Sequence, residues 1–393
     1  MRGRLIAAGD CAAGRQPELV GQLGSAFGNV QGGYGYGAGG RGFGDTCDRL
    51  RSGWMWARRL QAVALALGAG VALGACGTAA TGSAGRLTTA RAQRPARWAT
   101  LSHASRPLDI VGPRADGALV LAAAGRLFLL TAAGVISPYP GPYRSPGGEE
   151  PYVALARAGR AGCSFGRDSV YAIRLAGPRG VVAIDSSGRV RRFATLSAPG
   201  LIDGIAFDDT GRFGHRLLVT INAGARSTVD AVDCRGAVSA ITGGAPRVEG
   251  GIVIAPAGFG RFGGDLIASG EASGQIFAIS PQGRSRLLAD SGLPHGNDIG
   301  VESEAFVPTG RAVAALVADR LTPGNPHPGD DVVLKLGAPA LAAAGVRAGD
   351  LLVATEGGAL TDAVSCSSAG CRVRYVANGP AVAHLEGHIA FAP

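Results

Sequence analysis

The chain has 393 residues and a formal net charge of +9, from 38 Lys or Arg and 29 Asp or Glu. Its first 76 residues hold eight Arg and four acidic residues and carry +4 of this charge, which leaves the remainder modestly basic at +5. From residue 157 onward the arginines are scattered over turns, without a basic stripe or interleaved aromatic residues, so we expect no nucleic-acid partner.

Residues 1–54 include the Gly-rich run NVQGGYGYGAGGRGFGD and show no apolar periodicity. We expect this segment to be either an upstream reading frame that is not translated or a disordered extension. In both cases it contributes nothing to a folded core.

Residues 55–76 have the order of parts that is typical of a secretion signal. Arg58-Arg59 forms a short basic region, and the uncharged apolar stretch from Leu60 to Ala75 is shorter than the ~20 residues that a membrane span needs. Leu73-Gly74-Ala75-Cys76 resembles the bacterial lipobox, in which the cysteine is lipidated. We therefore predict an extracytoplasmic lipoprotein anchored through Cys76, with a buried helix as the alternative.

The cysteines beyond Cys76 are Cys163, Cys234, Cys366 and Cys371, an even number that predicts two disulfides in an exported protein. Cys366 and Cys371 close a short loop that is typical of a bridged hairpin, worth about 2 kcal/mol by loop entropy. The remaining pair is Cys163 and Cys234. Zinc is less consistent with these cysteines because no CxxC or HxxxH spacing accompanies them.

Residues 77–97 are small and polar and predict a flexible tether, and residues 98–393 form the folded domain. From residue 100 on, apolar runs are short and bounded by Gly, Pro, Asp or Ser, which indicates an all-β protein. The segments DGIAFDDTGRFGHRLLVT (203–220) and GGIVIAPAGFGRFGGDLIAS (250–269) repeat one pattern of strand, turn and strand. A repeat of roughly 45 residues with about four strands is typical of a β-propeller blade.

Six apolar second strands predict a six-bladed β-propeller. They lie at 118–121, 169–173, 216–220, 265–268, 312–317 and 350–355. The inner strands should begin near Glu150, Asp203, Glu249 and Asp298, with a degenerate copy near Leu341. Leu108-Asp109-Ile110 and the C-terminal HLEGHIAFAP (384–393) compete for one inner position, so seven blades is the alternative. A β-sandwich or barrel would explain the strands but not the repeat.

The starts of inner strands in a propeller face one end of the central channel. At ~8 Å separation and an effective dielectric near 20, each pair of like charges there costs ~2 kcal/mol. The acids must therefore bind a cation, protonate in part or pair with arginine. Carboxylates with an Asn carbonyl suit one Ca²⁺ or Mg²⁺. The candidate ligands are Glu149, Asp203, Glu249, Asn297 and Asp298, with Glu150 and Glu386 facing the same opening.

The segments GEEPYVAL (148–155), LIDGIAFDDTGR (201–212), VEGGIVIAPAG (248–258) and HGNDIGV (295–301) resemble inner-strand motifs of the gluconolactonase and senescence-marker family and of NHL-type propellers. The resemblance implies six blades and one divalent metal held by Glu, Asn and Asp. Glu149 falls on the family's Glu, Asp203 where it has Asn, and Glu249 where it has Asp, so two of the three positions depart in residue type.

Two functions follow as hypotheses. The first is a lipid-anchored, monomeric propeller that binds a small-molecule or cell-envelope ligand, with DRLTPGNPHPGDD (319–331) as a recognition loop. The alternative is a metal-dependent lactone or ester hydrolase, in which the metal polarises the carbonyl and Glu249 activates water. A quinone-dependent dehydrogenase lacks a His and Arg cluster, and no Gly-x-Ser-x-Gly elbow is present.

Overall fold

The computed structural model describes residues 95–145, 150–157, 164–296, 298–310 and 313–393. The predicted signal segment, its lipidated Cys76 and nearly all of the tether lie outside these residues and stay predictions. In the part of the chain that is described, no helix is long and apolar enough to cross a membrane.

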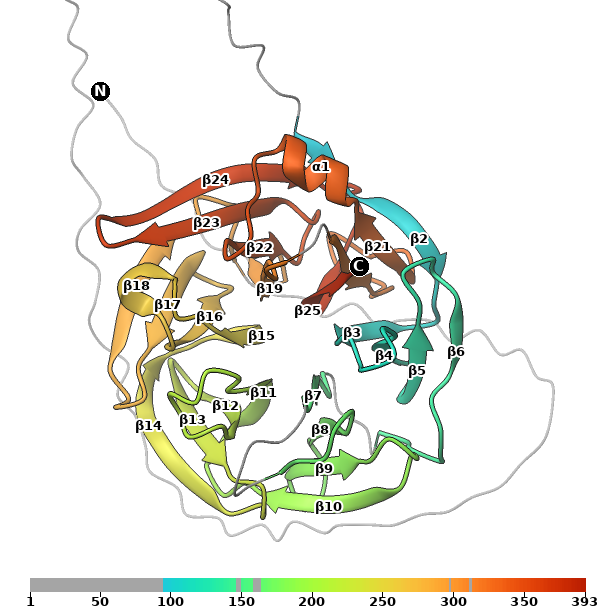
Figure 1. Ribbon diagram of the computed structural model, residues 1–393, viewed down its shortest axis with the longest axis vertical. Helices are drawn as coiled ribbons and strands as arrows, with labels where there is room; N and C mark the ends of the chain where they lie inside the picture. The colour runs from blue at the N-terminus through green and yellow to red at the C-terminus, as the bar shows by residue number, and fades with distance from the viewer. Residues whose placement is uncertain (1–94, 146–149, 158–163, 297, 311–312) are drawn as a thin grey trace, which may run out of the picture. The chain divides into compact units, whose positions relative to one another are not determined.

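The described residues form six sheets arranged around a central axis (Figure 1), and all their strand pairs are antiparallel except that of β1 with β24. We number the blades by the chain order of their inner strands and give each from inner to outer strand. Blade 1 contains β3 (Pro107–Val111), β4 (Leu119–Ala123), β5 (Arg126–Leu130) and β6 (Ile136–Pro138). Blade 2 contains β7 (Val153–Leu155), β8 (Val170–Arg174), β9 (Gly180–Ile184) and β10 (Val190–Thr195). Blade 3 contains β11 (Leu201–Phe207), β12 (Leu217–Ala223), β13 (Arg226–Val232) and β14 (Val238–Pro246).

Blades 4 to 6 contain the rest of the strands. Blade 4 contains β15 (Glu249–Ile254), β16 (Leu266–Gly270), β17 (Gln275–Ile279) and β18 (Ser285–Asp290). Blade 5 contains β19 (Val301–Phe306), β22 (Leu351–Thr355), β23 (Thr361–Ser367), β24 (Gly370–Asn378) and β1 (Ala96–Arg97). Blade 6 contains β25 (Leu385–Ala392), β20 (Ala314–Asp319), β21 (Val332–Leu336) and β2 (Ala99–His103). A short 3₁₀ turn, η1 (Gly260–Phe262), and one helix, α1 (Ala338–Ala343), complete the described elements.

The inner strands contact one another in the order β3, β7, β11, β15, β19, β25 and back to β3, which closes a ring of six blades. The six-bladed prediction is confirmed. Both segments that competed for one inner position are inner strands, namely β3 and β25. The count stays at six because the predicted inner strand near Leu341 is wrong: this segment is α1, whose Ala-rich sequence with an early Pro favours a helix.

Blade 6 joins the two ends of the described domain. Its inner strand β25 is C-terminal and pairs with β20, and its outer strand β2 is N-terminal and pairs with β21. Strands β20 and β21 of this blade lie in sequence between β19 and β22 of blade 5. The two blades are therefore interleaved along the chain, and their folding is linked.

The hydrophobic core lies between neighbouring blades. The second strands β4, β16, β20 and β22 are buried at every residue because sheets cover both of their faces. This explains why the sequence shows continuous apolar runs there rather than strict alternation. Between blades 2 and 3, the rings of Phe165, Tyr171, Phe193 and Phe207 pack mainly edge to face, at centroid distances of 4.8 to 5.8 Å.

The predicted disulfide between Cys366 and Cys371 is confirmed. It links paired residues at the tip of the β23–β24 hairpin. Cys234 is also disulfide-bonded, but Cys163 lies outside the described residues, so that pairing stays a prediction.

Candidate functional site

Acidic residues followed by glycine begin three of the inner strands. Asp203-Gly204, Glu249-Gly250 and Glu386-Gly387 each lie at a shift in strand register, that is, at a β-bulge. Gly250 has φ +76° and Gly387 has φ +67°, a backbone conformation that L side chains rarely adopt. The bulges allow the acids to turn toward the end of the channel at which the inner strands begin, which we call the mouth.

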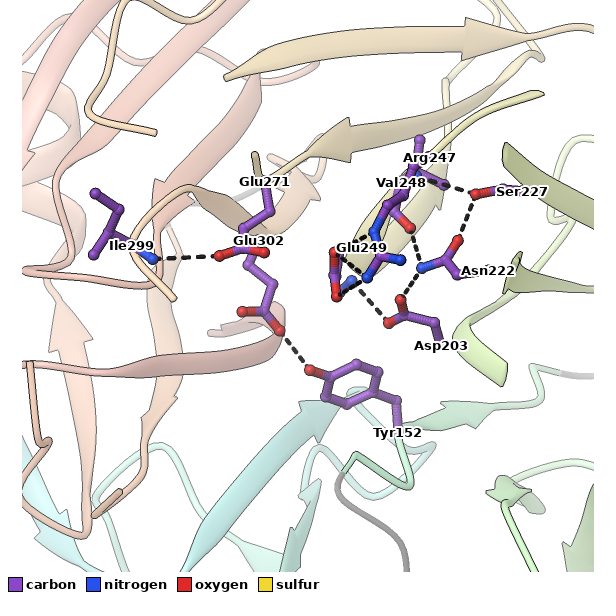
Figure 2. Close-up of polar contacts among 11 residues, drawn as sticks. Tyr152, Asp203, Asn222, Ser227, Arg247, Val248, Glu249, Glu271, Ile299 and Glu302 are labelled. Carbon is purple, nitrogen blue, oxygen red and sulfur yellow. Dashed lines mark hydrogen bonds and ion pairs between the residues drawn. The ribbon is translucent and has the colours of Figure 1, made fainter. Parts of the chain in front are cut away.

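Two further acids reach the mouth from second strands. β16 and β22 run antiparallel to their inner strands, so their ends lie beside the strand starts: Ser269 pairs with Glu249, and Thr355 pairs with Val301. Glu271 and Glu356 follow directly and are buried. Figure 2 shows Glu271 and Glu249 on the same opening.

Inner strands of blades that are not neighbours come into contact below the mouth. A side chain at Gly251 would have its Cβ 2.9 Å from the carbonyl oxygen of Gly387, so β15 and β25, which lie on either side of β19 in the ring, approach each other closely. His388 of β25 links two inner strands at this level: its Nδ1 lies 3.0 Å from Asp109 Oδ1 in β3, and its Nε2 lies 3.2 Å from the Ile252 carbonyl oxygen in β15. The other ends of all six inner strands line a cavity of about 530 Å³, in which apolar residues are joined by polar ones such as Arg157, Asp209 and His388. The acids and this cavity therefore occupy opposite ends of the channel.

Three carboxylates converge at the mouth. Glu150, Glu302 and Glu386 each have an oxygen within 4.8 Å of the others, and we call this group the carboxylate triad. The hydroxyl of Tyr152 lies 2.9 Å from Glu386 Oε2. It also contacts Glu302 Oε1, as Figure 2 shows. Among the ion pairs of the described residues, Glu386 bonds to Arg320 at 3.2 Å, whereas neither Glu150 nor Glu302 has a basic partner.

A tyrosine hydroxyl has one hydrogen and can donate it to only one carboxylate. If both carboxylates were ionised, the tyrosine oxygen would donate its hydrogen to one of them and would contact the other with no hydrogen between the two oxygens. Burial first, and then the negative charge of Glu386, raise the pKa of Glu302 and of Glu150 well above their usual range. The single hydrogen of Tyr152 and these raised pKa values both favour a proton on the triad when no cation is bound.

A second group shares Glu386 with the triad. His384 Nε2 lies 3.0 Å from Glu356 Oε1 and 3.4 Å from Glu386 Oε1. Burial lowers the pKa of His384, but these two carboxylates outweigh it and raise the pKa to about 9. The imidazole is therefore a cation at neutral pH, and it holds Glu386 in place together with Arg320.

Asp203 lies on the blade 3 side of the mouth, where it accepts bonds from Asn222 Nδ2 and, at 3.2 Å, from the Gly250 N–H. Burial, and next the charge of Glu249, raise the pKa of Asp203 to about 8. Glu249 is bound at 2.9 Å by Arg247, which bonds to both of its oxygens. The pKa of Glu271 is raised to about 8 as well, by burial and by the charge of Glu356.

The triad has the donors that a hard divalent cation prefers. Oxygens bound at about 2.4 Å to Ca²⁺ can lie up to about 4.8 Å apart, which matches the spacing of these three. The excess negative charge around Glu150 and Glu302 also favours a cation. The group formed by Glu356, His384 and Glu386 fits less well, because its imidazole is protonated and would have to lose its proton to bind metal.

The predicted site residues are only partly brought together. Asp203 and Glu249 lie at the mouth, on the blade 3 and blade 4 side. Asp298 is exposed, at φ +61° in the turn before β19, and belongs to neither group. Glu149 and Asn297 lie outside the described residues. Glu386 faces the mouth as expected, and Glu150 belongs to the triad.

Sequence reasoning missed Tyr152, Glu271, Glu302, Glu356, His384 and Arg320. For Glu302 a signal exists, because VESEAF (301–306) aligns with IDGIAF (202–207) and places Glu302 on Asp203. The pattern HGNDIGV (295–301) instead predicts a strand start at Asp298. The residues that follow second strands, Glu271 and Glu356, have no local signal, since only the pairing of strands brings them to the mouth.

Fold and site together define a six-bladed β-propeller with a buried group of carboxylates at one end of its channel. No family model and no curated protein matches the chain.

Among solved structures, the chain is similar to virginiamycin B lyase from Staphylococcus aureus, at 12% identity and a TM-score of 0.39, covering 70% of each chain. It is similar to a protein provisionally assigned as a gluconolactonase, at 12% identity and a TM-score of 0.33, covering 62% of this chain and 92% of that one. A calcium-binding protein, regucalcin, from Agrobacterium tumefaciens has 16% identity and a TM-score of 0.35, covering 59% of this chain and 74% of that one. Likenesses at this level carry no information about ligand or activity.

Proposed function

We propose that the protein binds a divalent cation, Ca²⁺ or Mg²⁺, at the channel mouth and uses it to hold a small-molecule or cell-envelope ligand. The observation that carries this proposal is the carboxylate triad, in which oxygens of the half-buried Glu150 and the buried Glu302 and Glu386 converge within 4.8 Å. Glu150, Glu302 and Glu386 would hold the ion. When bound, the cation supplies a positive centre for oxygen atoms of the ligand.

The residues around the triad favour this role. Arg320 and His384 fix Glu386 from one side, at 3.2 Å and 3.4 Å. Tyr152 is fully buried and fixes the distance between Glu302 and Glu386. Hydrogen bonds and ion pairs of this kind, from neighbouring residues to the metal-binding carboxylates, orient the ligands and are typical of pre-organised metal sites.

Cation binding by the metal-stripped full chain tests the proposal. Calorimetric titration with Ca²⁺ and with Mg²⁺ should show one site, and Glu302→Gln should weaken it by tenfold or more because one of three anionic ligands is lost. Glu304→Gln is the matched control: it lies on the same strand and is buried, but it bonds to Ser269 outside the triad. No binding, or equal loss in both variants, would reject the site.

Hydrolysis of a lactone or ester is the second candidate. It is favoured by Asp203 and Glu271, whose pKa values of about 8 lie near the neutral range in which general acids and bases work. Glu249 stays a candidate base, although its bonds to Arg247 occupy both oxygens. A panel of lactones and esters, run with and without chelator, tests this function. Chelator-sensitive turnover that Glu249→Gln or Glu271→Gln abolishes would support it, and no turnover would leave the binding role alone.

The location is a proposal of its own, in which the chain is exported and anchored through Cys76. Metabolic labelling with a palmitate analogue should mark the wild-type chain in the membrane fraction and should not mark Cys76→Ser. Ser83→Ala is the control, since Ser83 lies in the predicted tether beyond the lipobox. Labelling that persists in Cys76→Ser would reject the anchor.

A further inference from the structure

A second cavity opens on the mouth side of blade 1, and arginine dominates its charge. Its volume is about 330 Å³, within the range of small-molecule sites. Arg106, Arg126, Arg144 and Arg320 line it, and no Asp or Glu is among its described lining residues. Leu108, Ala122 and Val153 form part of an apolar floor.

One rigid turn gathers three of these arginines. Ala124 and Gly125, at φ +49° and +69°, form the tight turn between β4 and β5, which places Arg126 directly after it. The Ala124 N–H donates to the Arg106 carbonyl oxygen at 3.0 Å, and the Ser145 N–H donates to the Gly125 carbonyl oxygen at 2.8 Å. The segments that carry Arg106, Arg126 and Arg144 are thus fixed to one another by backbone bonds.

The guanidinium groups of these three residues are not neutralised by carboxylates in the described chain. None of its ion pairs includes Arg106, Arg126 or Arg144, and all three residues are exposed. Arg144 donates at 2.9 Å to the carbonyl of its neighbour Tyr143, which uses one of its five N–H groups. Like charges gathered around one cavity repel each other unless an anion lies between them.

We propose that this cavity binds an oxyanion, the carboxylate or phosphate group of a small molecule whose apolar part rests on the cavity floor. Guanidinium groups bind both anions through paired N–H bonds. Arg320 lines the cavity and also contacts Glu386 at 3.2 Å, so the cavity adjoins the carboxylate triad. The ligand would place its anionic end in this cavity and reach the cation with its other end. This orientation rests on the proposed function, but the anion site itself does not depend on a cation.

Calorimetric titration of the full chain, in chelator and at low salt, tests the site with three probes: inorganic phosphate, glycerol 2-phosphate and succinate. At least one should bind, and Arg126→Gln and Arg144→Gln should each weaken it by about tenfold or more, since each removes one charge-assisted contact. Arg192→Gln, on the exposed outer strand β10, is the control and should bind like wild type. Arg126→Lys, which keeps the charge but not the paired N–H groups, should fall between.

Circular dichroism of each variant confirms that it is folded before its binding is compared. Preference for the phosphates or for succinate identifies the source of the anion. Failure of all three probes to bind, or equal binding by Arg126→Gln and wild type, overturns the inference. Because the titration contains chelator, its outcome is independent of cation binding, which Glu302→Gln tests separately.

Discussion

At the scale of single residues, the arrangement of the mouth depends on the hydrogen bonds that its buried acids make. Tyr152 is fully buried and bonds to Glu302 and Glu386, which lie in strands of two different blades. Removing a partner from buried polar groups costs more than the bond itself contributes, because the groups left behind have lost their water as well. The tyrosine hydroxyl therefore holds two blades and two carboxylates together.

Tyr152→Phe should lower the free energy of unfolding by about 1 to 3 kcal/mol at neutral pH without cation, because it leaves carboxyl oxygens unpaired. Urea unfolding measures the change. Tyr375→Phe is the control, since its hydroxyl bonds to Asn378 on an exposed strand and the ring is 43% exposed. Equal losses in the two variants would show that the Tyr152 hydroxyl has no special role.

At the scale of elements, the inner strands are shaped by their bulges. The glycine after each acid lets one strand approach another at the axis, and it turns the preceding carboxylate toward the mouth. At Gly250 the space that a side chain needs is filled by Cγ and the carbonyl oxygen of Glu302. The sequence pair of acid and glycine therefore records a backbone requirement as well as a chemical one.

Gly250→Ala should destabilise the protein by about 2 to 5 kcal/mol, from its positive φ and from collision with Glu302. Gly258→Ala is the matched control, because no atom lies within 4 Å of the Cβ that it would add. We expect that control to stay within about 0.5 kcal/mol of wild type in thermal or urea unfolding. A tolerated alanine at Gly250 would contradict the described bulge.

At the scale of the whole molecule, the buried acids set how stability depends on pH. Burial is the main cause that raises the pKa of Asp203, Glu271 and Glu304 to about 8, and of Asp319 and Asp362 to about 6. A carboxyl group whose pKa is higher in the folded state keeps a proton that the unfolded chain has lost. Its contribution is full below the unfolded pKa and is lost as the pH rises through the folded one.

The protein without cation should therefore become less stable as the pH rises from about 4 to about 8. His384 acts in the same direction, because its contribution is present below its usual pKa of 6.5 and is lost as the pH rises through about 9. Urea midpoints across this range measure the slope. A slope of opposite sign would show that the buried acids are ionised and paired in the folded state.

Asp362→Asn tests this pH dependence of stability at a position away from the mouth. Asp362 is buried in β23, away from the triad, and one of its oxygens has no partner among the described residues. The variant should lose part of the slope between about pH 4 and 6, whereas Asp290→Asn, at an exposed carboxyl group, should not. Added Ca²⁺ should flatten the part above pH 6, if the proposed cation replaces the protons of the triad.

The repeat of short apolar runs predicted six blades, and all six second strands lie where the pattern placed them. The number of blades stayed open between six and seven because the strands of blades 5 and 6 are interleaved in the chain. For the site, Asp203 and Glu249 were found as starts of inner strands. Glu271, Glu356 and Arg320 were missed because they follow the ends of second strands.

The sequence by itself determined the class of fold, the apolar second strands, the hairpin disulfide and the acid–glycine pairs, because these follow from local alternation, spacing and backbone preference. Tertiary structure alone decided which carboxylates converge, which arginines share a cavity and where inner strands of separate blades meet. Those features depend on contacts between blades far apart in the chain, and local pattern has no information about strand pairing across a ring.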